Sequence, residues 1–64
     1  MPDSLLLTPE ETAAQLGIGR TKAFELISLG EIESVTIGRL RRVPADAVES
    51  YVARLRSQQA ASAA

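Results

Sequence analysis

Apolar residues along the chain recur first with helical spacing, then in alternation, and then with helical spacing again. The first helical stretch covers residues 9–16, with Ala13 and Leu16 on its inner side. Its start is well specified, because Thr8 can cap the amide of Glu11 while the carboxylate of Glu11 returns to the amide of Thr8. Gly17 ends the helix, since glycine adopts a left-handed conformation without steric cost.

The second helical stretch starts at Gly19 and closes at Gly30, after a short turn in which Ile18 is expected to be buried. Its inner positions follow the i, i+3, i+4 pattern and are Ala23, Leu26 and Ile27. Phe24 neighbours this inner face, so the pattern assigns its ring to the core rather than to base stacking. The outer face begins with polar and basic residues.

The alternating stretch predicts a β-hairpin. A two-residue loop would pair Val35 with Arg42 and so mix apolar and charged side chains on one face. A three-residue loop over residues 38–40 pairs Val35 with Val43 and leaves Thr36 and Arg42 together on the outer face. We expect the three-residue loop, because register follows the hydrophobic pattern wherever one face is buried.

A third helix is predicted from Ala45, because Pro44 cannot extend a strand ladder. Its apolar positions are Val48, Tyr51, Val52 and Leu55. We expect residues 1–56 to form one domain and residues 57–64 to be a frayed or disordered tail without an apolar anchor. Residues 5–7 are expected to form a short strand or arm against the core, with the anchoring of a partner as the alternative.

Composition restricts the chemistry that the chain can perform. Its 64 residues include no Cys and no His, which removes disulfides, thiolate metal sites and the usual acid–base side chains. A domain of this size has a small core and little room for a catalytic cleft. No apolar run approaches the roughly 18 residues that span a bilayer. We therefore expect a cytoplasmic protein that is not an enzyme, with no catalytic residues, cofactor, metal or membrane partner.

Charge is unevenly distributed, although seven basic and eight acidic residues give a net charge of only −1. Five of the basic residues lie between Arg20 and Arg42, where only three acidic residues lie. The order of elements predicts a mainly α fold with a small β-hairpin, namely a winged helix-turn-helix of three helices plus a wing. In such a fold the second helix enters the major groove of DNA, and the gathered positive charge suits that role.

From residue 6 to residue 55 the sequence resembles the excisionase-type family of small MerR-like winged helix-turn-helix proteins. The segments that carry the resemblance are LTPEE at 7–11, LGIGRT at 16–21, LGEI at 29–32 and IGRLRRVP at 37–44. Two positions depart from the family pattern: Gly19 replaces the serine that often caps the recognition helix, and Glu25 stands where a basic residue is common.

The resemblance implies a sequence-specific double-stranded DNA-binding protein that acts as an excisionase, or recombination directionality factor. Such a protein binds repeated sites in attachment-region DNA with cooperative self-association, bends that DNA, and helps an integrase to excise it. A transcriptional regulator encoded by a phage or mobile element would use the same DNA interface. A protein-interaction module without DNA binding is the other alternative, and the acidic pI of about 5.2 favours it.

The candidate DNA-binding residues lie at the start of the second helix and along the hairpin. They are Arg20, Thr21, Lys22, Glu25, Arg39, Arg41 and Arg42. Arg20 is expected to contact a guanine, Thr21 a thymine methyl or a phosphate, and Lys22 a phosphate. Glu25 accepts from a cytosine amino group or pairs locally with Lys22 or Thr21. The hairpin arginines enter a minor groove or clamp phosphates, unless they only protect an edge strand.

Overall fold

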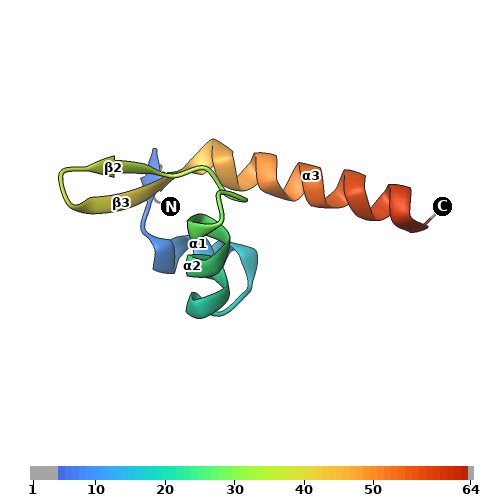
Figure 1. Ribbon diagram of the computed structural model, residues 1–64, viewed down its shortest axis with the longest axis horizontal. Coiled ribbons are helices and arrows are strands. Elements are labelled where there is room, and N and C mark those ends of the chain that lie inside the picture. The colour runs from blue at the N-terminus through green and yellow to red at the C-terminus, as the bar shows by residue number, and fades with distance from the viewer. Residues whose placement is uncertain (1–4, 64) are drawn as a thin grey trace.

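The computed structural model describes residues 5–63, so residues 1–4 of the predicted domain and residue 64 of the predicted tail lie outside it. Within this range the elements are β1 (Leu6–Leu7), α1 (Pro9–Leu16), α2 (Arg20–Ser28), β2 (Val35–Ile37), β3 (Leu40–Pro44) and α3 (Ala45–Ala63). The strands form one antiparallel sheet in the order β1-β3-β2. The β2–β3 hairpin and α3 extend to opposite sides, with α1 and α2 beneath them (Figure 1). The predicted mainly helical fold with a wing is confirmed.

Helix α1 begins and ends where the local signals predict. Thr8 Oγ1 accepts a hydrogen bond from the amide of Glu11 at 3.0 Å, and a Glu11 carboxylate oxygen accepts one from the amide of Thr8 at 2.9 Å. The buried hydroxyl of Thr12 donates to the carbonyl of Thr8 at 3.0 Å. At the other end Gly17 has a φ of 69°, the left-handed conformation that closes the helix.

One apolar cluster joins the sheet to α2 and α3. Its buried members are Leu7, Leu26, Ile27, Ile32, Val43, Ala47 and Val48. Ile32 and Val43 are fully buried, whereas Leu16, Ile18 and Tyr51 pack against the cluster from its edge. Ile18 is therefore half-buried rather than the buried plug that we predicted. The small side chains of Ala13 and Ala23 are also buried, which suits the packing of α1 against α2.

The N-terminal arm is a strand, as predicted. Leu7 of β1 lies opposite Val43, and Leu6 lies opposite Pro44, the last residue of β3. The carbonyl of Leu5 accepts a hydrogen bond at 2.9 Å from the amide of Ala45, where α3 begins. Pairing of β1 with β3 thus ties residues 5–7 to the junction between the wing and α3.

The hairpin register differs from the predicted one. Val35 pairs with Arg42, Thr36 with Arg41, and Ile37 with Leu40, so the loop has two residues and our three-residue prediction is wrong. The prediction assumed a buried hairpin face, but every residue of β2 is exposed. Turn geometry decides the register instead. Gly38 has a φ of 61° whereas Arg39 has no positive φ, and glycine at the first loop position is typical of a type II′ turn.

Helix α3 begins at Ala45, as predicted, and continues to Ala63, so most of the predicted tail is helical in form, while its fraying stays a prediction. Packing against the core has already nucleated the helix, and alanine and glutamine extend it at little cost. Its middle is held by Arg54, which donates to the carbonyl of Glu31 and lies over the ring of Tyr51 at 5.8 Å from the ring centroid. No helix that the structure describes combines the length and the apolar character needed to cross a membrane.

The type II′ turn makes a prediction about Gly38. Replacing it with L-alanine should lower the free energy of unfolding by about 1–2 kcal/mol, because an L-residue is strained at positive φ. Replacing it with D-alanine by chemical synthesis should cost much less, since a D-residue prefers this conformation. Thermal unfolding followed by circular dichroism measures both. Equal losses for the two variants would contradict the turn assignment.

Candidate nucleic-acid interface

Helix α2 presents its first turn to solvent. The buried residues Ala23, Leu26 and Ile27 fix one side of the helix against the core, as predicted. Four candidate residues therefore remain exposed on the rest of its surface: Arg20, Thr21, Lys22 and Glu25. Gly19 supplies no side-chain cap, so the first amides of α2 are open to an external acceptor such as a phosphate oxygen.

Arg20 is held from two sides. Its Nε lies 3.7 Å from a carboxylate oxygen of Glu10 in α1, and its guanidinium lies over the ring of Phe24 at 5.9 Å from the centroid. The side chains of Arg20 and Glu10 are 69% and 53% exposed, so their ion pair contributes little to stability. Its main effect is to restrict the direction of the guanidinium.

The second cation of α2 is also paired. Lys22 Nζ lies 3.3 Å from a carboxylate oxygen of Glu25, three residues later on the helix. Of the two roles predicted for Glu25, the local pair with Lys22 is the one present in the free chain. Both side chains are more than half exposed, so the pair is readily exchanged for contacts with a ligand.

The wing arginines do not share one face. Arg39 lies exposed in the loop. Arg41 donates to Ser34 Oγ at 2.7 Å, whereas half-buried Arg42 donates to the carbonyl of Arg41 at 2.9 Å. Directly opposed residues in a hairpin share a face, so Thr36 lies with Arg41 and our prediction that it lies with Arg42 is wrong.

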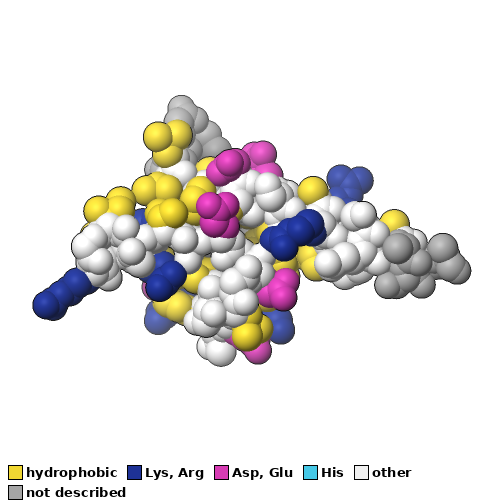
Figure 2. Space-filling model, turned by 45° about the horizontal axis from the view of Figure 1, so that its top comes forward, with side chains coloured by type: hydrophobic (Ala, Val, Ile, Leu, Met, Phe, Trp, Pro, Cys, Tyr) yellow, Lys and Arg dark blue, Asp and Glu magenta, His cyan; other side chains and the backbone are white. Residues whose placement is uncertain are grey.

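On the face drawn in Figure 2 the basic side chains form separate groups rather than one continuous patch. Figure 2 shows Lys and Arg side chains at the end of the hairpin, on the helical body and along α3, with acidic side chains between them. The first turn of α2 and the wing tip are therefore two separate basic sites, and both cations of the α2 site are paired with carboxylates. Among residues 5–63, no cluster of three or more acidic side chains is placed to hold a metal ion.

Two apolar features of this surface were missed by sequence analysis. Phe24 is 39% exposed, so its assignment to the core is wrong. It lies at the boundary between the buried and outer faces of α2, where helical spacing alone gives no firm answer. On the wing, Ile37 and Leu40 are 58% and 54% exposed beside the loop, on the face that also carries Val35 and Arg42.

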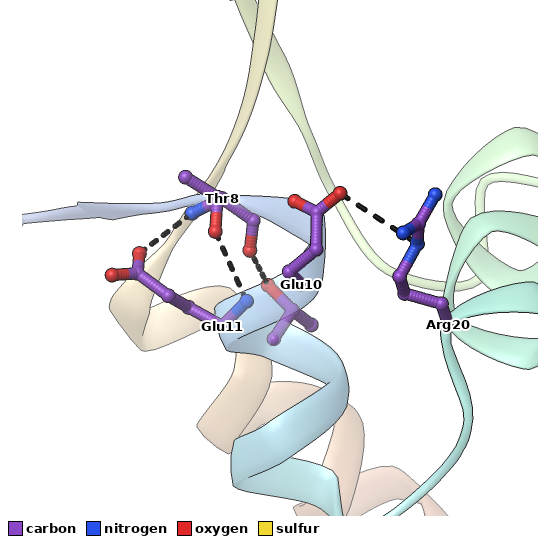
Figure 3. Close-up of polar contacts among 5 residues, drawn as sticks. Thr8, Glu10, Glu11 and Arg20 are labelled. Atoms are coloured by element: carbon purple, nitrogen blue, oxygen red, sulfur yellow. Dashed lines mark hydrogen bonds and ion pairs between the residues drawn. The ribbon is translucent and has the colours of Figure 1, made fainter.

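Figure 3 shows how the first turns of α1 and α2 meet. The reciprocal bonds of Thr8 and Glu11 hold the start of α1, and the carboxylate of Glu10 points from this turn toward the guanidinium of Arg20. The two adjacent glutamates, Glu10 and Glu11, therefore have different roles. Glu11 caps its own helix, while Glu10 reaches across to the next one.

Comparison with known proteins points to one family. The family described as "Helix-turn-helix domain" matches residues 6–56. A protein named "Probable excisionase" from Saccharopolyspora erythraea is 58% identical over 62 residues, which cover 97% of this chain and 63% of that protein. A protein named "Excisionase" from Streptomyces ambofaciens is 43% identical over 47 residues, which cover 73% of this chain and 76% of that protein. No solved structure gives a significant match.

Proposed function

The chain belongs to the excisionase-type family of small helix-turn-helix proteins, and on this basis we propose that it is a sequence-specific double-stranded DNA-binding excisionase. It binds repeated sites in attachment-region DNA, bends that DNA, and promotes excision by an integrase. It performs no covalent chemistry itself. The observation that carries the proposal is the exposed first turn of α2, where Arg20 is directed by Glu10 and Phe24.

In the proposed complex, α2 lies in the major groove with its first turn nearest the base edges. Arg20 donates two hydrogen bonds to O6 and N7 of a guanine, the commonest specific contact of this side chain. Thr21 contacts a thymine methyl or a phosphate. Lys22 leaves Glu25 for a phosphate, and the released Glu25 is free to accept from a cytosine amino group. The uncapped amides after Gly19 add a second phosphate site.

The wing forms the second contact point. Arg39 projects from the loop into the adjacent minor groove or onto a phosphate, where its charge replaces that of a counterion. Arg41 and Arg42 support it from the two faces of β3, and the hydrogen bond of Arg41 to Ser34 steadies the base of the hairpin. Two contacts on separate elements favour a bent path for the DNA, because each contact pulls the backbone toward the protein.

Cooperative self-association follows from the small size of the domain. A module of this kind buries roughly 600–1,000 Å² on DNA, which limits the affinity of one copy. Several copies on neighbouring sites therefore act together. The exposed apolar side chains Val35, Ile37 and Leu40 on the wing support such contacts, since they lie outside the core and on one face of the hairpin. The integrase is the further protein partner that excision requires.

The direct test uses the attachment-region DNA of the locus that encodes the chain. We expect footprints at repeated sites, and we expect the protein to stimulate excision when it is added to the cognate integrase. Absence of any gel shift at low salt would contradict DNA binding and favour a protein-interaction module. Binding that alters transcription from a nearby promoter but leaves excision unchanged would favour the transcriptional regulator.

The major-groove contact predicts the behaviour of Arg20 variants. Arg20→Ala should weaken specific binding by about 1–3 kcal/mol and should relax the preference at one base pair. Arg20→Lys should relax the same preference while weakening overall binding less, because lysine keeps the charge but lacks the planar fork. Affinities for a set of singly substituted sites measure this. Uniform weakening on every sequence would contradict a base contact.

The wing contact predicts a change in salt dependence. Arg39→Ala should reduce the slope of log K against log salt concentration by about one, since one phosphate contact is lost. Arg56→Ala, which removes the same charge from α3, serves as the matched control and should leave the slope unchanged. Fluorescence anisotropy at several salt concentrations gives both slopes. If the Arg39 variant keeps the full slope, the wing arginine only protects the edge strand.

A further inference from the structure

Phe24 is a large aromatic side chain that lies outside the buried apolar cluster. It is 39% exposed, and it belongs neither to the buried apolar cluster nor to the residues that pack against that cluster. A single exposed apolar side chain is ordinary on a protein surface, so what singles out Phe24 is its position beside Arg20. One turn before Phe24 on α2 lie the polar, exposed residues Arg20 and Thr21, whereas Ile27, three residues after it, is buried.

The position of Phe24 on α2 places it within the proposed major-groove surface. It follows Arg20 by four residues and Thr21 by three, and residues at these spacings lie side by side on a helix. The guanidinium of Arg20 rests over the ring at 5.9 Å from its centroid. A guanidinium that contacts a base edge therefore brings the ring close to the neighbouring base pairs.

We propose that Phe24 forms an apolar subsite for the 5-methyl group of a thymine. This inference rests on the proposed DNA-binding function and names a second base that the same helix recognises. In the major groove the thymine methyl is the apolar feature of the base edges, and phenylalanine is one of the side chains that contact it. Phenylalanine makes no hydrogen bond to the base, so this contact distinguishes thymine from the other bases by shape and by the burial of its methyl group alone.

Helix geometry sets where this thymine lies. One turn of helix separates Phe24 from Arg20, a rise of about 5.4–6 Å, and base pairs follow one another at roughly 3.4 Å. The thymine is therefore expected one or two base pairs from the guanine that Arg20 contacts. Loss of the methyl group should weaken binding about fourfold, which corresponds to the burial of one methylene-sized group.

The cation–π contact gives Phe24 a second role, which the test must separate from the first. The ring restricts the guanidinium of Arg20 whether or not a methyl group is present on the DNA. Removal of the DNA methyl group therefore changes only the subsite, whereas removal of the ring changes both the subsite and the position of Arg20. A substitution in the DNA is also immune to any effect of a protein variant on folding.

The experiment replaces each thymine of a footprinted site, one at a time, with uracil, which lacks the methyl group. Wild-type protein should lose about fourfold in affinity at one position, one or two base pairs from the guanine that Arg20→Ala identifies. Phe24→Ala should bind more weakly but should be indifferent to uracil there. Phe24→Leu should keep the sensitivity, because leucine also presents an apolar surface.

The matched control is Thr21→Ser, which removes the methyl group of the other side chain proposed to contact a thymine. It should retain the sensitivity to uracil at the position where Phe24→Ala loses it, although it can lose sensitivity at a position of its own. The proposal is overturned if wild-type protein binds the site but no uracil substitution weakens it, or if the sensitivity disappears in Thr21→Ser and persists in Phe24→Ala. Failure of the wild-type chain to bind any DNA overturns the proposed function itself, so the two failures are distinct.

Discussion

The whole arrangement depends on the burial of Val43 in the central strand. Its side chain is fully buried opposite Leu7, and burying a side chain of this kind contributes about 1.5–3 kcal/mol. A domain of 64 residues has few such contributions. β3 is paired with β1 on one side and with β2 on the other, so the strand that anchors in the core also carries the wing. The packing of Val43 in the apolar cluster therefore also helps to position the wing.

Local sequence signals were enough to predict where the helices begin. The wrong predictions of the hairpin register and of the burial of Phe24 concern side chains that are less buried than the sequence pattern suggests. The capping box at Thr8 and the left-handed Gly17 act within a few residues, so the bounds of α1 follow from the sequence. The register of the hairpin does not, because Val35 and its neighbours in β2 have no buried face to align. The burial of Phe24 was predicted wrongly for a related reason. Phe24 lies at the border between the buried and exposed faces of α2, and only the packed structure decides which face includes it.

The charges of α2 are balanced before any ligand arrives. Arg20 faces Glu10 and Lys22 faces Glu25, and exposed pairs of this kind are worth at most about 1 kcal/mol each. DNA can therefore replace these carboxylates as partners of the two cations at a small cost in free energy. The same carboxylates weaken the attraction of the helix for the phosphates of DNA of any sequence. On the proposed function this balance lowers non-specific binding and leaves discrimination to the geometry of Arg20 and its neighbours. Affinity is then recovered by binding several copies.

The first turn of a helix is ordinarily easily frayed, but in α1 it is held by a capping box. Thr8 is bound by Glu11, and Thr12 returns a further bond to the carbonyl of Thr8. Glu10 therefore lies on a capped first turn, and it faces Arg20 from there. The cap of α1 thus has a consequence outside its own helix: it positions the carboxylate that pairs with Arg20 of α2.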